Sequence, residues 1–311
     1  MQKKIQTFLG GAIILILLPF VVTLLFQGDT ILPGPSERMT TQSETDTQEN
    51  GFDSEEIEGK VISIVAKEIA VSGEREAIKA QAVIARTNLI AARISGEEEP
   101  EGLSADAMMR QFGEDAFERC YRKLSECVEA TKGLVLTSGN KVIEAPYFAV
   151  SAGHTRNAAD AFGKESVSYL KSVESKQDIE SEEYLYVEFL DIAGFVADCN
   201  AAFPEAGLTA EGINDQIEVL TRDEAEYVRE IRLGAKTVGG EEFRKALKLR
   251  SACFTIKEVE GKLRIVTKGV GHGVGLSQYG AEYLAAQGHT YEEILKTYFS
   301  EIKITEYKKT E

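Results

Sequence analysis

The sequence predicts a protein of the α+β class, with a single N-terminal transmembrane helix followed by a mixed helix and sheet domain outside the cytoplasm. Two observations support this. Nineteen residues from Phe8 to Phe26 carry no charge, and the later sequence contains both helix-period and strand-period patterns. Of 311 residues, 28% are charged and 43% are hydrophobic. This composition excludes a disordered or collagen-like chain.

The uncharged segment Phe8–Phe26 is long enough to cross the hydrocarbon layer as a helix. Lys3 and Lys4 precede it and acidic residues follow, so the positive-inside rule places the N-terminus in the cytoplasm. A cleaved signal peptide is less favoured, because no small-x-small cleavage site follows. We therefore expect residues 1–26 to be a cytoplasmic stub and anchor in a single-pass cell membrane protein.

Residues 27–56 hold eight acidic residues and Arg38, and we expect them to form a disordered acidic tether. The formal net charge of the chain is −16, of which residues 57–311 carry −11. Nucleic acid is an improbable partner, because binding a polyanion requires clustered cations. Residues 57–311 are expected to form one extracytoplasmic domain.

The segment Ile57–Ala70 predicts a helix with one apolar face. At 100° per residue, Ile57, Val61, Ile64 and Val65 form a stripe, and Glu68 lies in its middle, whereas Glu58 and Lys67 point elsewhere. Desolvation disfavours the charged form of a carboxyl group, which suits a general acid. An internal ion pair with Arg or Lys is the equally weighted structural interpretation.

A second helix is predicted from Arg75 to Arg93 after the break at residues 71–73. It is rich in alanine, and Lys79, Arg86 and Arg93 recur at seven-residue spacing along one side. These cations could bind substrate beside Glu68, or they could form a solvated face.

Residues 269–288 form a glycine-rich turn after a predicted strand, Lys262–Lys268, with a helix beginning near Leu276. The pattern matches neither a dinucleotide-binding nor a phosphate-binding loop, and it lacks the G-x-S-x-G elbow of a serine hydrolase. Polar and aromatic groups on such a turn suit sugar binding, although a packed crossover is nearly as consistent. The candidate ligand-binding residues are His272, Ser277, Gln278 and Tyr279.

The middle of the chain predicts a hairpin, 133–138 with 141–150, around Gly139-Asn140. Residues 180–250 are expected to be largely helical and exposed. Cys120 and Cys127 share one helical stripe and could ligate a metal with His154, but buried thiols or one disulfide fit better. We predict no metal and no cofactor.

From about Ile57 to Phe299 the chain resembles the stage II sporulation protein D family, the peptidoglycan lytic transglycosylases of spore-forming bacteria. The resemblance rests on VAKEIAVSGEREAIKAQAVIARTNLIAA, TKGLVLTSGNKVIEAPYFAVSAGHT, VGGEEFRKALKLRSACF and GHGVGLSQYGA. The chain departs from the family where Ala66-Lys67-Glu68-Ile69 replaces the common Ala-Ala-Glu-Met, and where residues 149–154 replace a His-Ser-x-Ser-Gly-Gly run.

The resemblance implies that Glu68 is the catalytic acid and that substrate-groove positions fall on Lys79, Arg86, Tyr169, Asp178 and Tyr279. It further implies cleavage of the MurNAc-β-1,4-GlcNAc bond in peptide-stripped glycan strands, with 1,6-anhydroMurNAc ends, during septal wall thinning and engulfment. The implied partners are peptidoglycan, a cell-wall amidase/endopeptidase and other engulfment membrane proteins, with the domain facing the intermembrane space of the forespore. A non-catalytic peptidoglycan-binding or amidase-enhancer module is the alternative.

Overall fold

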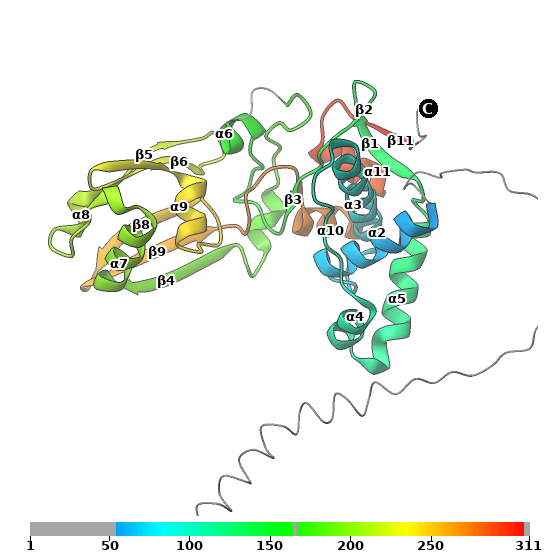
Figure 1. Ribbon diagram of the computed structural model, residues 1–311, viewed down its shortest axis with the longest axis horizontal. Helices are drawn as coiled ribbons and strands as arrows, with labels where there is room; N and C mark the ends of the chain where they lie inside the picture. The colour runs from blue at the N-terminus through cyan, green and yellow to red at the C-terminus, as the bar shows by residue number, and fades with distance from the viewer. Residues whose placement is uncertain (1–53, 164–166, 308–311) are drawn as a thin grey trace, which may run out of the picture. The chain divides into compact units, whose positions relative to one another are not determined.

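The computed structural model describes residues 54–163 and 167–307, which contain both helices and short antiparallel sheets (Figure 1). The predicted α+β class is therefore confirmed. Within these two ranges no helix is long and apolar enough to span a membrane. The predicted span Phe8–Phe26 and residues 27–53 of the predicted tether lie outside the described residues. The first described helix begins at Ser54, three residues before the expected start of the domain.

The first hydrophobic core is built around helix α3, Arg75–Ser95, which contacts helices α2, α5, α10 and α11 as well as strand β1. Thirteen of its residues are buried, five of them alanines that allow neighbouring backbones to approach closely. Gly96 ends α3 in the left-handed conformation. The other helices of this core are α2 Ser54–Glu68, α4 Ala105–Phe112, α5 Glu114–Glu129, α10 Gln278–Ala286 and α11 Tyr291–Tyr298.

A three-stranded antiparallel sheet of order β11-β1-β2 packs against this core. Its strands are β1 Leu134–Ser138, β2 Lys141–Val142 and β11 Lys303–Glu306. The predicted two-residue turn is confirmed: Gly139 and Asn140 both have positive φ, as a type I′ hairpin requires. The second predicted strand is shorter than expected, since pairing with β1 ends at Val142.

Residues 180–250 contradict the expectation of exposed helices, because they form most of a second hydrophobic core. Two three-stranded sheets, of order β4-β9-β8 and β5-β6-β7, surround it together with helices α7 and α9. These strands are short and mix apolar with polar residues, so their sequence pattern does not distinguish them from exposed helices. The elements are β4 Leu185–Asp191, α7 Ile192–Ala202, α8 Ile213–Gln216, β5 Ile217–Arg222, β6 Val228–Leu233, β7 Lys236–Gly239, α9 Gly240–Ala246, β8 Phe254–Val259 and β9 Lys262–Lys268.

The glycine-rich turn links the two cores. Strand β10, Leu276–Ser277, pairs in parallel with β3, Tyr147–Phe148, and α10 starts directly after it. Gly271 and Gly275 have positive φ, and a Cβ on Gly275 would lie 2.0 Å from the Pro146 carbonyl oxygen. Glycine is thus required at these positions. Three short helical segments complete the described fold: α6 Ala158–Phe162, η1 Lys176–Glu180 and η2 Pro204–Ala206.

Candidate functional site

Glu68 is the last residue of α2, at the point where the chain leaves the helix for the turn before α3. The apolar stripe predicted for this helix is buried as expected, with Ile57, Val61, Ile64 and Val65 all in the first core. Glu68 itself is only half-buried. Its position at the end of a buried stripe holds the backbone firmly while leaving the carboxyl group within reach of a ligand.

Two side chains from elements distant in sequence meet Glu68. The Tyr147 phenol of β3 donates a hydrogen bond to the Glu68 carboxylate, and burial together with this acidic neighbour raises the pKa of Tyr147. Gln278 Nε2 at the start of α10 donates to the Glu68 backbone carbonyl over 2.7 Å. This bond satisfies a carbonyl that the helix end leaves without an intrahelical partner.

Gln81 lies behind this group on α3. It is fully buried, and its Oε1 lies 3.4 Å from Gln278 Nε2. Its own Nε2 is buried and has no hydrogen-bond partner among the described residues. An unpaired buried amide donor costs free energy, so its presence beside Gln278 marks this polar group as more than a product of core packing.

His272 of the glycine-rich turn belongs to the same neighbourhood through Tyr147. Its Nδ1 accepts a hydrogen bond from the Val274 N–H, and its ring also donates to the Tyr147 backbone carbonyl. Burial lowers the pKa of His272 to about 4, with Phe148 and Phe162 rings on either side at 5.7 Å. Its imidazole is therefore neutral near pH 7 and orients the backbone that carries Tyr147.

Asp178 and Ser277, both predicted to bind substrate, instead lie fully buried and bind each other. The Ser277 hydroxyl donates to Asp178 Oδ2 over 2.6 Å, and the Ser151 N–H donates to the same oxygen over 2.6 Å. Ser277 also caps α10 by accepting from the Gly280 N–H. Since neither side chain is accessible, they position the start of α10, and with it Gln278, rather than touch a ligand.

The structure also corrects the expectation for Arg86, which has no exposed surface. Its guanidinium forms a two-pronged ion pair with the Glu58 carboxylate, with Nε to Oε1 at 2.9 Å. The remaining N–H groups donate to the carbonyls of Leu134 and Val128. The internal ion pair considered for Glu68 thus exists, but Glu58 forms it, and Arg86 joins α2 and α3 to the end of α5 and the start of β1.

The other predicted residues are accessible but have not been brought to Glu68 by any contact in the described structure. Lys79 binds Glu76 Oε1 over 2.6 Å. Tyr169 is half-buried beside Glu144, and burial followed by that acid raises its pKa. Burial, followed by the nearby charges of Glu180 and Asp178, raises the pKa of Tyr279. These three residues remain predictions as substrate contacts.

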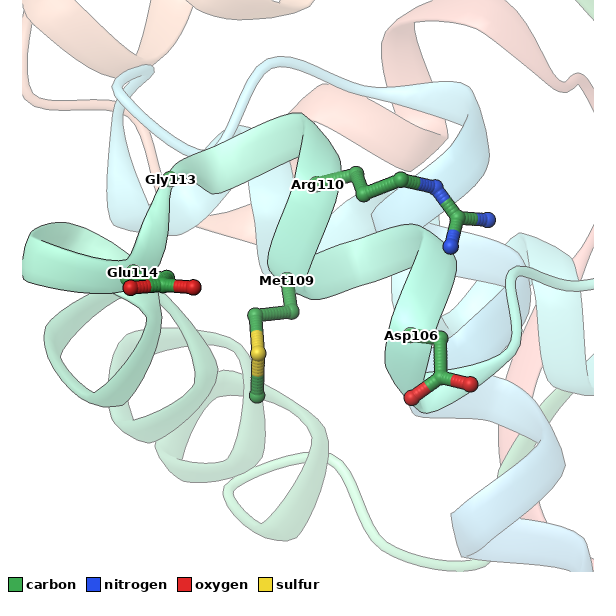
Figure 2. A pocket seen from close by; sticks show the side chains of 5 residues that line it. All are labelled: Asp106, Met109, Arg110, Gly113 and Glu114. Carbon is green, nitrogen blue, oxygen red and sulfur yellow. The ribbon is translucent and has the colours of Figure 1, made fainter. Parts of the chain in front are cut away.

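A hollow of about 370 Å³ lies at the turn between α4 and α5 (Figure 2). None of the site residues predicted from the sequence lines it; the lining residues are Asp106, Met109, Arg110, Gly113 and Glu114. All four cysteines are free thiols, and no cluster of three or more potential metal ligands occurs within residues 54–163 and 167–307.

Sequence reasoning missed Tyr147, Gln81 and Glu58. Tyr147 stands next to Pro146 in a segment taken as a hairpin strand, so only its parallel pairing with β10 shows its role. Gln81 could have been noticed as one of two amides, with Asn88, in the alanine-rich helix predicted from Arg75 to Arg93. Glu58 was excluded by the helical wheel because it lies beside the apolar stripe, but α5 and β1 cover that side as well.

Comparison with known proteins agrees with this architecture. A family model described as "Stage II sporulation protein" matches residues 46–138, a range that includes Glu68, Glu58 and Arg86. The stage II sporulation protein D of Bacillus amyloliquefaciens is 34% identical over 264 residues, covering 80% of this chain and 74% of the relative. The protein of the same name from Bacillus subtilis (strain 168) is 32% identical with the same coverage.

A more distant relative is a Bacillus subtilis protein named "Amidase enhancer", which is 24% identical over 291 residues and covers 78% of this chain but 40% of the relative. The fold and the site define a mixed α+β domain with an accessible acid at the end of a buried helix. At this level of identity and coverage, the chain belongs to the stage II sporulation protein D family.

Proposed function

We propose that this chain is a membrane-anchored peptidoglycan lytic transglycosylase, a lyase that cleaves the MurNAc-β-1,4-GlcNAc bond of peptide-stripped glycan strands. The observation that carries the proposal is the Glu68 carboxyl group, which is half-buried at a rigid helix end and in contact with Tyr147. The membership of the chain in a sporulation protein family supports a role in septal wall thinning and engulfment.

A single carboxyl group suffices for this reaction, whereas glycoside hydrolysis ordinarily uses two. Glu68 donates its proton to the glycosidic oxygen as the bond to C1 breaks. The resulting carboxylate then takes the proton of the muramoyl C6 hydroxyl as that oxygen closes onto C1. The product is a 1,6-anhydroMurNAc end, no water is consumed, and Glu68 returns to its protonated form.

The neighbouring groups have defined tasks in this scheme. The Tyr147 phenol donates to the carboxylate when Glu68 is ionised, which stabilises the state between the two proton transfers. Gln278 fixes the helix end that carries Glu68. Lys79, Tyr169 and Tyr279 are proposed as sugar and carboxylate contacts in the groove, and His272 orients Tyr147 through its carbonyl.

The proposed setting follows from the sequence. Residues 1–26 anchor the chain with its N-terminus in the cytoplasm, residues 27–53 act as the tether, and the domain works outside the membrane on glycan strands close to it. An amidase/endopeptidase that removes stem peptides would supply the substrate, so this enzyme and other engulfment membrane proteins are the proposed partners.

The test is product analysis on purified peptide-free glycan strands. Wild-type protein is expected to release fragments with 1,6-anhydroMurNAc ends, which differ by one water from the reducing ends of hydrolysis in mass spectrometry. Glu68→Gln is expected to release none above background, while Glu98→Gln, the same change at an exposed site, keeps full activity. Reducing ends from the wild type, or anhydro ends from Glu68→Gln at the wild-type rate, would refute the proposal.

The second candidate is a non-catalytic module that binds wall and stimulates an amidase, and the relative named "Amidase enhancer" favours it. It predicts that wild-type and Glu68→Gln proteins are equally unable to cut glycan yet equally able to accelerate an added amidase. The same product assay, run with and without amidase, separates the two candidates.

A further inference from the structure

Strand β4 has an unusual distribution of side chains for the edge of a sheet. In the sheet of order β4-β9-β8, β4 pairs with β9 on one side and has no strand on the other among the described residues. Its side chains on the outer face are Leu185, Val187 and Phe189, with exposed fractions of 53%, 44% and 54%. An antiparallel sheet covered on one face normally places polar residues on the other.

The inner face explains why this row is not part of the core. The residues of β8 and β9 that face α7 and α9 are Phe254, Leu263 and Ile265, and all three belong to the second hydrophobic core. The register pairs Ile265 with Glu188, so Glu188 lies on the inner side and its neighbours in β4 must point outward. The apolar row is therefore fixed outside by the register of the sheet.

Three cations lie beside this row, on the neighbouring strand β9. In the β4–β9 register, Lys268 stands opposite Leu185, Arg264 stands opposite Phe189, and Lys262 stands opposite Asp191 at the strand end. Lys262 and Lys268 are exposed, and neither they nor Arg264 form an ion pair within residues 54–163 and 167–307. In a chain of net charge −16, a face with this excess of unpaired cations is out of keeping with the rest of the molecule.

We propose that the open edge of β4 is a docking site for an extended segment of a partner protein, apolar at its centre and acidic at both ends, which adds to the sheet as a fourth strand. The row from Leu185 to Phe189 is about 17 Å long, so five residues of the partner strand would match it. Backbone hydrogen bonds would supply affinity, and alternate apolar side chains would lie beside Leu185, Val187 and Phe189.

Charge and backbone geometry favour this occupant over two others. A second copy of this chain, paired through its own β4, would add three more cations, Lys262, Arg264 and Lys268, to the same face of the joined sheet, which disfavours that pairing. A lipid surface could receive the apolar row but could not satisfy the unpaired N–H and C=O groups along the β4 edge. An acidic strand satisfies both the cations and the backbone.

The probe is a fluorescent, end-capped peptide, Glu-Glu-Val-Thr-Val-Thr-Val-Glu-Glu, titrated against the full chain in neutral phosphatidylcholine nanodiscs. We expect saturable binding that Val187→Glu weakens at least tenfold. The control is Ile94→Glu, which places the same charge at an exposed apolar residue outside β4, in helix α3, and should leave binding unchanged. No binding up to about 1 mM peptide, or equal loss in both variants, would overturn the proposal.

Three further arms make the result specific. Lys268→Glu should weaken binding of this peptide and strengthen binding of the version with Lys at both ends, and it carries the test if Val187→Glu does not fold. N-methylation of one alternate set of peptide amides should abolish binding while methylation of the other set does not; equal binding of both would exclude strand pairing. A Val187-dependent dimer in light scattering, or Val187-dependent binding of phosphatidylglycerol vesicles in place of the peptide, would also overturn it.

Discussion

The two ends of helix α2 each carry a glutamate, and the two are used in opposite ways. Glu58, in the first turns, is buried and fully bound by the Arg86 guanidinium and the Gly133 N–H. Glu68, at the last position, is half-buried: its carboxylate accepts a hydrogen bond from the Tyr147 phenol, and Gln278 binds its backbone carbonyl rather than the carboxylate. A carboxyl group with a complete set of donors holds the fold together, whereas one left partly open is available for chemistry.

The largest effect on stability is expected from replacing Arg86, the partner of Glu58. Arg86→Met leaves the Glu58 carboxylate buried without its partner, so we expect a loss of about 3–5 kcal/mol in the free energy of unfolding. Replacing both partners, Glu58→Leu with Arg86→Met, should recover most of that loss because no buried charge remains. Urea denaturation followed by circular dichroism measures both. A stable Arg86→Met protein that has lost only glycan binding would instead support the substrate role expected from the sequence.

Asp178 tests whether a second buried acid is also structural. Asp178→Ala leaves the Ser151 N–H and the Ser277 hydroxyl without an acceptor and should cost about 2–3 kcal/mol of stability. Asp178→Asn keeps an acceptor oxygen and should retain most stability and activity. If Asp178→Asn is as stable as the wild type but inactive on glycan, the residue acts through its charge on substrate and the structural assignment is wrong.

His272 makes the stability of the folded protein depend on pH. Its pKa in the fold is about 4, below the ordinary value of about 6.5, because burial penalises the imidazolium. As pH falls from about 6.5 to 4, the unfolded chain takes up a proton that the folded protein does not, so stability is lost in that window, by about 3 kcal/mol.

His272→Gln removes that titration. The wild-type stability measured by denaturation should therefore fall more steeply from pH 6.5 to pH 4 than that of His272→Gln, while the exposed His289→Gln should follow the wild type. Parallel curves for wild type and His272→Gln would show that the imidazole is not held neutral.

Tyr147 should show the smallest effect and the most specific one. Tyr147→Phe removes one hydrogen bond to the Glu68 carboxylate, worth about 1 kcal/mol, so kcat is expected to fall five- to tenfold with stability nearly unchanged. A kcat equal to that of the wild type would mean that Tyr147 does not act through Glu68.

The sequence allowed the local features of the fold to be predicted where one pattern dominates. The α3 helix, the Gly139-Asn140 turn, strand β9 and the glycine-rich crossover were all found because periodicity or positive φ left a clear signature. The second core was missed because β4 has apolar side chains on both faces, Leu185, Val187 and Phe189 outside and Leu190 against the core, so it lacks the alternation that identifies a strand.

The site was predictable only in part, for a physical reason. The helical wheel identified Glu68 from its own helix, but burial of Arg86 and Asp178 depends on α5, β1 and the Ser151 loop, which local patterns do not place. The wheel also set Glu58 aside because it treats a helix as having one covered side. Tyr147 reaches Glu68 only through the parallel pairing of β3 with β10, which joins residues far apart in the chain.

The most direct test compares Glu68→Gln and Glu58→Gln side by side, measuring the release of anhydro ends from glycan strands and urea denaturation on the same preparations. We predict that Glu68→Gln loses activity by a factor on the order of 10² or more with unchanged stability. Glu58→Gln should lose stability but keep its activity per folded molecule under conditions where it is folded. An active Glu68→Gln, or a Glu58→Gln protein that is fully stable and inactive, would contradict the division of roles between the two ends of α2.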